Sequence, residues 1–557
     1  MLRIPSAIFH AILIVLLLGG PLAAAEKPRL IVLVVLDQVR EDYMTRHAAS
    51  FVPGGFRLLR ERGAVFTQCS YLHAGTLTAP GHAVIATGTD PMVNGIVGNE
   101  WFDRAAGART TADRDPNQKL LGAVNASPGA SPHWLKGSTL ADELRLATGS
   151  RGRVISIAPK ARSAIIPGGH GANAAYWFDK DTGFAISSTY YMAELPAWVH
   201  EFNSRDWVEK YAGQPWTPVD NPKGEPFLTF PTASNDGERQ KLSRAVDDSA
   251  FLTDIQFAFA RAAVVNEKLG GDEHPDLLAL SLSALDHVGH DFGPDSPRTH
   301  DTIFRADRAL AEFLQFLDQQ IGLNNVWIAL TADHGVAPMP EVARGLRLDA
   351  GRIANPRVTG RIEEALNRAY PAAGHAGGEG DKDDKWVENY SVPNLYLNQK
   401  RIQRRGLDPA EVERRAAAAL MELRAFTAVF TRSALTGCRP SSELIGKVCR
   451  SWSPARSGDL YLVFKPYWMY ELLDNSTGTT HGSPWSYDAH VPLVFFGAAF
   501  RPGAYHTPAS PADLPVTLAA ALGISAPAQA SGRVLVEALN PDGVPAAVRQ
   551  RKAAKAR

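Results

Sequence analysis

Cysteine is scarce in this chain, with three among 557 residues. So few cysteines exclude a disulfide-framework protein, and no Cys-x-x-Cys pair is present to form a zinc ribbon or a redox motif. Cys438 and Cys449 are close enough in sequence to bridge a small loop in an oxidising compartment. Cys69 is left over, and we expect a buried free thiol there.

Net charge is also absent, because 58 Lys and Arg balance 58 Asp and Glu. This balance argues against a strongly basic nucleic-acid-binding surface and against a polyanionic tail, while a local basic pocket stays possible. Hydrophobic residues make up 45% of the chain and charged residues 21%, which excludes a wholly disordered protein. The length suits one large α/β domain with insertions.

Long apolar runs are missing except at the N-terminus. Arg3 precedes the apolar run Ile8–Leu18, and the small residues of Leu22–Ala25 follow it. This pattern is typical of a cleaved secretory signal, which we predict over residues 1–25. The alternative is a membrane anchor, but the run is shorter than the roughly 20 residues that span a bilayer. We therefore expect a periplasmic or secreted protein with no membrane span after cleavage.

Strands and helices alternate along the rest of the chain. Leu30–Leu36 is a continuous β-branched run, as in a strand buried on both faces. The pattern predicts an α/β fold, a doubly wound, mostly parallel sheet flanked by helices. Further strands are predicted at Val154–Ile157, Leu277–Leu285, Val326–Leu330, Leu460–Phe464 and Val491–Phe496, and helices at Ala245–Leu269, Ile303–Ile321 and Pro409–Leu423.

Two regions interrupt this alternation. Residues 171–240 are rich in aromatics, proline and asparagine, and residues 345–450 include the polar, glycine-rich stretch Gly374–Lys385. We interpret both as insertions that form a cap over the carboxyl edge of the sheet. Residues 26–557 are then one catalytic domain.

Acidic and imidazole side chains gather where predicted strands end. Ligands of open α/β sheets bind at that edge. A single aspartate there is usually a helix cap or turn former, but three aspartates with three histidines suit divalent zinc. Six such ligands are too many for one tetrahedral zinc and fit two, which together clamp a phosphoryl group. The residues are Asp37, Asp286, His290, Asp333, His334 and His481.

A nucleophile is available beside them. Thr78 opens a predicted helix that runs through Ala86, with Pro80 in the first turn, where proline is tolerated. Its hydroxyl has two possible roles: capping the helix, or attacking a phosphate as a zinc-bound alkoxide. The spacing alone does not decide between them.

Several motifs together resemble the alkaline phosphatase superfamily, in its phosphodiesterase/nucleotide-pyrophosphatase branch. The closest resemblance is to the exported, phosphate-irrepressible bacterial alkaline phosphatases, and it extends from Asp37 to Ser525. The motifs are DQVR at Asp37, TLTAPGH at Thr76–His82, GTDPMVNGIVGN ending at Asn99, SALDHVGHDFGP at Ser283–Pro294, TADHG at Thr331–Gly335 and THGSPWSYDAHVPL at Thr480–Leu493.

The resemblance implies a role for each matching position, and no ligand or nucleophile position departs from the pattern. Thr78 corresponds to the nucleophile and Asn99 to a donor to a phosphoryl oxygen. Lys160 and Arg162 correspond to the Lys-x-Arg pair that separates the monoesterases from their diesterase relatives. Asp286, His290 and His481 correspond to ligands of one zinc, and Asp37, Asp333 and His334 to ligands of the other, to which Thr78 bridges.

The Lys-x-Arg pair also has a physical interpretation. It follows a predicted strand, and residues two apart in an extended segment point to the same side. Lys160 and Arg162 would then converge on a phosphate monoester, whose dianion rewards two cations more than a diester does. The alternative is a pair of solvated surface cations.

The expected function is therefore hydrolysis of small phosphate monoesters by a two-zinc alkaline phosphatase, through a phosphothreonine. The main alternative is a phosphodiesterase or nucleotide pyrophosphatase with the same two-zinc site. A sulfatase would need a Cys/Ser-x-Pro-x-Arg motif, and Cys69 is followed by Ser-Tyr-Leu. A non-catalytic binding protein could lose ligands freely, yet the whole set is present.

Overall fold

The computed structural model of the chain describes residues 27–124, 128–371, 385–471 and 478–540. The predicted signal peptide and nearly all of the stretch 374–385 lie outside these ranges. No helix within the described ranges combines the length and the apolar character needed to cross a bilayer.

A sheet of eleven strands forms the centre of the molecule. Strand β1 pairs in parallel with both β12 and β13, so that Val32 lies opposite Leu278 on one side and Ile328 on the other. All seven residues of β1 are buried, as its continuous apolar sequence predicts. The α/β class with a mostly parallel sheet is thereby confirmed. In spatial order the strands are β21 (Gly503–Tyr505), β2 (Ala64–Phe66), β20 (Leu493–Phe496), β13 (Val326–Thr331), β1 (Leu30–Leu36), β12 (Asp276–Leu282), β7 (Val154–Ile157), β8 (Ala174–Phe178), β9 (Ala185–Ser188), β5 (Arg114–Leu121) and β6 (Pro128–Ala130).

Helices cover both faces of this sheet. One layer holds α4 (Thr78–Thr87), α6 (Leu140–Ala147), α7 (Ala161–Gly168) and α20 (Asp513–Leu522). The other holds α3 (Phe56–Arg62), α10 (Leu252–Asn266), α11 (Ala284–Phe292) and α12 (Pro297–Gln320). Shorter helices are α2 (Glu41–Arg46), α5 (Pro91–Asn94), α13 (Pro340–Gly345) and α19 (Ser486–Ala489).

The single helix predicted over Ala245–Leu269 is wrong. The structure has α9 (Asp236–Asp247) and then α10, with a break between them. Ser249 explains the break, because its hydroxyl donates to the carbonyl of Val246 and accepts from the amide of Phe251. Such local bonds replace helical ones.

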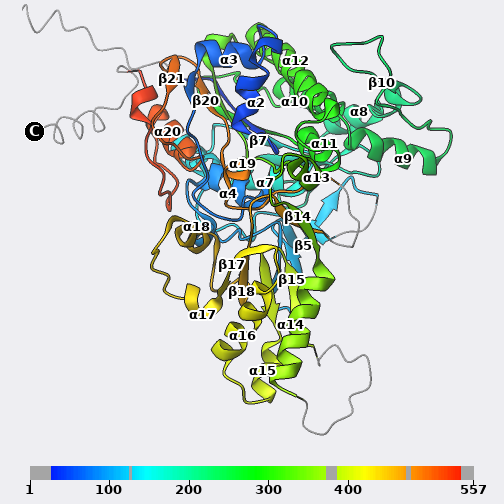
Figure 1. Ribbon diagram of the computed structural model, residues 1–557. Coiled ribbons are helices and arrows are strands. Elements are labelled where there is room, and N and C mark those ends of the chain that lie inside the picture. The colour runs from blue at the N-terminus through cyan, green and yellow to red at the C-terminus, as the bar shows by residue number, and fades with distance from the viewer. Residues whose placement is uncertain (1–26, 125–127, 372–384, 472–477, 541–557) are drawn as a thin grey trace, which may run out of the picture.

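The cap is built on its own small sheet, with strand order β15 (Val387–Ser391), β16 (Asn394–Leu397), β18 (Leu460–Phe464) and β17 (Phe426–Thr431). A second pair joins β14 (Gly351–Ala354) to β19 (Trp468–Glu471). Figure 1 labels β15, β17 and β18 below the central domain. Leu460–Phe464 was predicted for the main sheet; that placement is wrong, because β18 pairs antiparallel with β16 and β17. The cap helices are α14 (Asn355–Ala369), α15 (Gln399–Arg404), α16 (Pro409–Met421), α17 (Arg432–Leu435) and α18 (Glu443–Ser451).

The region predicted as a first insertion begins inside the main sheet, where it supplies β8 and β9. Its remainder forms α8 (Ala197–Ser204) and the pair β10 (Pro215–Trp216) and β11 (Leu228–Thr229), and α8 packs on α10. A hairpin not expected from the sequence, β3 (Glu100–Asp103) with β4 (Ala108–Thr111), lies against β15 instead. That hairpin and the cap sheet lie together over the carboxyl edge.

Two of the three cysteines form a disulfide, and the third is a free thiol. Cys438 and Cys449 form a disulfide with a Cα–Cα distance of 6.1 Å, and Cys69 is a buried free thiol.

One buried ion pair joins the hairpin to the cap. The Asp459 carboxylate, 1% exposed, accepts hydrogen bonds from Arg104 Nη2 at 2.9 Å and from the Leu397 amide at 2.7 Å. Removing it leaves both donors without their acceptor.

We therefore expect Asp459→Ala to lower the free energy of unfolding by about 2–4 kcal/mol. Urea denaturation measures it. The matched control is Glu61→Ala, whose partner Arg57 and own carboxylate are both exposed, and it should cost less than about 0.5 kcal/mol. Equal losses in the two variants would contradict the structural role of Asp459.

Candidate active site

Sheet direction explains why distant segments meet. Strands β1, β12 and β13 run in parallel, so the residues that follow them emerge at one edge. Strand β20 is antiparallel to β13, with Leu493 opposite Thr331, so the segment before β20 reaches the same edge. Helix α4 also lies there. An added Cβ at Gly81 would be 2.2 Å from the Asp333 carbonyl oxygen, so only glycine permits this approach.

The first donor group is formed by Asp37, Asp333 and His334. All three side chains are fully buried. His334 Nε2 lies 3.4 Å from Asp37 Oδ1 and 3.6 Å from Asp333 Oδ2. Thr78 Oγ1 is 3.5 Å from the same nitrogen. Four donor atoms from three separate segments thus converge, as the sequence predicts.

The second donor group centres on Asp286, in the first turn of α11. His290, one turn later on the same face, places Nε2 3.1 Å from Asp286 Oδ1, and His481 Nε2 lies 3.7 Å from that oxygen. Donor atoms of Asp286, His334 and His481 lie within 4.8 Å of one another. The rings of His334 and His481 stack at 3.5 Å, so the two groups adjoin.

The histidines share one tautomer. Nδ1 of His290, His334 and His481 lies 2.8–2.9 Å from the backbone carbonyls of Thr479, Gly335 and Thr76. A carbonyl only accepts, so each Nδ1 carries a hydrogen. When neutral, each ring presents the lone pair of Nε2 to the site, which is the arrangement of a metal-ligating histidine. Burial lowers the pKa of His290, but Asp286 outweighs burial and raises it to about 9.

Buried negative charge dominates the electrostatics of the site. Burial and the Asp286 charge raise the pKa of Asp37, but Lys160 and the nearby histidines outweigh them and bring it to about 2. Burial and the Asp37 charge raise the pKa of Asp333 well above its usual value. The two neighbouring carboxylates cannot both ionise easily unless a cation joins them.

Divalent metal ions fit this donor set. Asp37 Oδ1 and Asp333 Oδ2 are buried and have no hydrogen-bond partner within the described structure, and they are the same oxygens that face His334. Carboxylate oxygen and imidazole nitrogen are ligands that zinc accepts. The orphaned oxygens and the aligned Nε2 atoms therefore form candidate metal sites.

Thr78 is not the N-cap of its helix. Helix α4 begins at Thr78 itself, and the N-cap residue Leu77 makes no side-chain capping hydrogen bond. Asn99 accepts a hydrogen bond from the Ala79 amide through Oδ1 at 2.8 Å. Its Nδ2 group is thereby left as the donor on the other side of the amide.

Lys160 and Arg162 do not lie in an extended segment, so the geometric argument for them was wrong. Lys160 is the N-cap of α7 and Arg162 lies in its first turn. Lys160 Nζ donates to Asp37 Oδ2 at 2.7 Å and also contacts Asp286 Oδ2. Its ammonium group thus bridges the two donor groups, while Arg162 faces a cavity.

This cavity has a volume of about 290 Å³. Asn99 and Arg162 line it on the side of the donor groups, and the hairpin and the cap supply the other walls. Its remaining lining residues are Leu77, Glu100, Arg109, Thr111, Asn355, Tyr390, Ser391, Val392 and Tyr470. Both polar and apolar side chains line the cavity.

Two residues that donate hydrogen bonds to the buried carboxylates were not predicted from the sequence. Gln38 donates from Nε2 to Asp286 Oδ1 at 2.7 Å and from its backbone to Asp333 Oδ1 at 3.2 Å. Ser283 donates to Asp37 Oδ2 at 2.9 Å. Ser283 directly follows β12 and Gln38 lies two residues after β1, and this placement was the only available signal.

Comparison with known proteins finds one matching family model and several similar proteins. The family model for type I phosphodiesterase / nucleotide pyrophosphatase matches residues 31–484. Alkaline phosphatase PhoV of Synechococcus elongatus is 32% identical, with 92% of this chain and 93% of that protein covered. A protein of Myroides odoratus named calcium-transporting ATPase is 33% identical, with 92% and 95% covered.

Alkaline phosphatase PafA of Elizabethkingia meningoseptica is 29% identical, with 94% of this chain and 98% of that protein covered. A PafA crystal structure matches with a TM-score of 0.85 at 28% identity, covering 93% of this chain and all of that one. A solved PafA mutant replaces a threonine and an asparagine 21 residues apart, and a lysine and an arginine 2 apart. Thr78 and Asn99, and Lys160 and Arg162, have the same separations.

The contacts of Lys160 predict how metal removal affects stability. In chelator-treated protein, its ammonium group neutralises buried carboxylates. Lys160→Met should therefore lower the unfolding free energy of the metal-free protein by about 3–5 kcal/mol. Zinc should restore most of the loss, since the metal supplies the missing positive charge. Thermal unfolding with chelator and with zinc measures both effects.

Arg162→Met is the matched control. In the described structure Arg162 makes no ion pair with these carboxylates, so its loss should change the stability of the metal-free protein much less. If Lys160→Met lowers the free energy of unfolding equally with chelator and with zinc, the metal assignment is contradicted.

Proposed function

On the premise that this chain belongs to the type I phosphodiesterase / nucleotide pyrophosphatase family and is an enzyme of the alkaline phosphatase superfamily, we propose that it hydrolyses small phosphate monoesters with two zinc ions. The observation that carries this proposal is the grouping of Thr78, Asn99 and Arg162 beside the two donor groups. Thr78 is the nucleophile, and the other two bind the phosphoryl group.

The ligands divide between two metal positions. Asp37, Asp333 and His334 would hold one zinc, and Thr78 Oγ1 lies 3.5 Å from His334 Nε2. Asp286, His290 and His481 would hold the other. Zinc bound there supplies Lewis-acid chemistry, lowering the pKa of a coordinated hydroxyl group and neutralising developing negative charge.

The chain's own groups orient the reaction. Thr78 Oγ loses its proton to solvent and attacks phosphorus, and a new P–O bond forms to the threonine. The bond to the ester oxygen breaks, and the leaving oxygen takes a proton from solvent. Asn99 Nδ2 donates to a phosphoryl oxygen, and its orientation is set by the Ala79 amide. The positive N-terminal end of α4 favours the incoming anion. Water then cleaves the phosphothreonine and releases inorganic phosphate.

Monoester specificity rests on Lys160 and Arg162. A monoester dianion carries one more unsubstituted oxygen than a diester, and two cations stabilise that extra negative charge. Both side chains start from the first residues of α7, so they approach the site from one side. The alternative activity, phosphodiester or nucleotide pyrophosphate cleavage, would use the same core and is supported by the family model.

We also propose that the enzyme acts outside the cytoplasm. The N-terminal sequence supports export, and the Cys438–Cys449 disulfide is consistent with an oxidising compartment.

Removal of the nucleophile is the first test. Thr78→Val keeps the shape of the side chain and removes the hydroxyl, so kcat should fall at least about 10³-fold. Acid-quenched parent enzyme should carry phosphate on Thr78 by mass spectrometry. Thr87→Val, on the same helix but at its far end, is the control and should keep activity. A Thr78→Val protein with parental turnover would end the proposal.

The second test separates monoesterase from diesterase. An aryl phosphate monoester and its matching diester are compared by kcat/KM in zinc-loaded protein. We expect the parent to prefer the monoester by at least about 10²-fold. Lys160→Ala/Arg162→Ala should lose most of that preference, because two charge-assisted contacts are removed. A parent that prefers the diester would replace this function with the alternative.

A further inference from the structure

Helix α18 of the cap reaches the loop that leads to Thr78. Ser451, its last residue, is 2% exposed. The Ser451 hydroxyl accepts hydrogen bonds from the Ala74 amide at 2.7 Å and the Gly75 amide at 3.1 Å, and donates to the Lys447 carbonyl at 3.1 Å. The Ala74 amide also donates to the Lys447 carbonyl at 3.1 Å. The cap thus holds two consecutive backbone groups of the central domain.

The same loop supports both donor groups of the site. The Thr76 carbonyl lies 2.9 Å from His481 Nδ1 and therefore orients that ring. The Thr76 hydroxyl donates to the Ser483 carbonyl at 2.8 Å. Thr78 follows two residues later. A displacement at Ala74 would therefore move the nucleophile and a metal ligand together.

Helix α18 has further bonds around this loop. Lys447 Nζ donates to the Pro484 carbonyl at 3.2 Å, three residues after His481. Arg450 pairs with the Asp90 carboxylate at 2.7 Å, beyond the end of α4. The helix therefore contacts the chain on both sides of the active-site loop.

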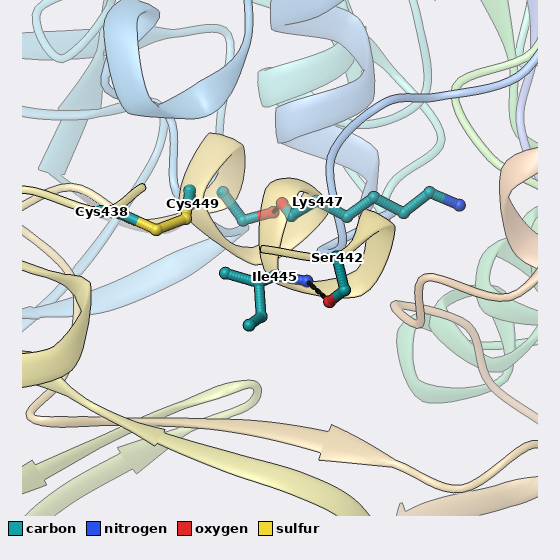
Figure 2. Close-up of a disulfide and its surroundings, with 6 residues drawn as sticks. Cys438, Ser442, Ile445, Lys447 and Cys449 are labelled. Carbon is teal, nitrogen blue, oxygen red and sulfur yellow. Dashed lines mark hydrogen bonds between the residues drawn. A yellow bond between two sulfur atoms is a disulfide. The ribbon is translucent and has the colours of Figure 1, made fainter. Parts of the chain in front are cut away.

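The disulfide fixes this helix. Figure 2 shows Cys449 on α18 joined to Cys438, which precedes the helix, while the Lys447 side chain extends away from the bond. Both cysteines pack in one apolar cluster with Ala74 and Trp485. A nine-residue helix has little stability of its own, so such tertiary ties decide its position.

We propose that Ser451 is a positioning residue for the reaction, which sets Thr78 relative to His481 and is itself held by the Cys438–Cys449 disulfide. The proposal rests on the catalytic roles given to Thr78 and His481 under the proposed function. Small displacements of reacting groups lower a reaction rate by large factors. The contact of Ser451 with the loop before Thr78 should therefore affect the rate.

The experiment compares Ser451→Ala with Ser451→Thr in the full, zinc-loaded chain. Ser451→Ala removes the shared acceptor, so kcat for an aryl phosphate should fall about 10–100-fold, with KM within about threefold. Hydrogen exchange at the Ala74 and Gly75 amides should accelerate at least about 10-fold. Ser451→Thr keeps the hydroxyl and should restore both values to within about threefold of the parent.

Ser442→Ala is the matched control. Ser442 caps the same helix through a 3.4 Å bond to the Ile445 amide, seen in Figure 2, and touches neither Ala74 nor Gly75. It should leave kcat within about threefold. The Cys438→Ser/Cys449→Ser variant should lower kcat, and its effect should add less than fully to that of Ser451→Ala, because both act through one helix.

Parental kcat and exchange in Ser451→Ala would overturn the proposal, as would an equal kcat loss in Ser442→Ala or no rescue by threonine. Failure of the proposed function has a different signature, since the parent itself would then prefer the diester or leave the monoester uncleaved. Hydrogen exchange would still report whether Ser451 holds the loop.

Discussion

The structure depends on the convergence of three buried carboxylates at one edge of a parallel sheet. Asp37, Asp286 and Asp333 are each 3% exposed or less, and isolated charges in such surroundings are strongly destabilising. The surrounding groups supply the compensation. Lys160 bridges two of the carboxylates, Gln38 and Ser283 donate to them, and three imidazoles direct Nε2 toward them. Two oxygens remain without partners, and they are where a metal fits.

Much of this arrangement could be predicted, because the main signal is local. A strand that is buried on both faces has a continuous apolar sequence, and the residue after it lies at the carboxyl edge of the parallel sheet. That reasoning located Asp37 and Asp333 without knowledge of their partners. His481 follows a different rule, since its segment precedes β20, and only the antiparallel direction of that strand returns it to the same edge.

What could not be predicted depends on pairing between distant segments. Leu460–Phe464 has the composition of a central strand, yet it pairs in the cap, because its neighbours β16 and β17 lie there. The hairpin after Asn99 carries no strong apolar pattern, and its Glu100 and Arg109 became cavity residues only through contact with the cap. Lys160 does contact the buried carboxylates, but the geometric reason for expecting it there fails, since helix α7 begins at Ala161 and Arg162 is already helical.

Lys160 also connects charge balance to specificity. With both donor groups lacking metal, its ammonium is the positive charge closest to Asp37 and Asp286 among the contacts described. Two dications held by those groups would supply that compensation themselves and repel a nearby ammonium. The same lysine would then be electrostatically favoured toward an arriving phosphate dianion, on the side where Arg162 and Asn99 face the cavity. Lys160 can thus stabilise the metal-free fold and discriminate between substrates. In both roles its positive charge compensates an excess of negative charge at the site.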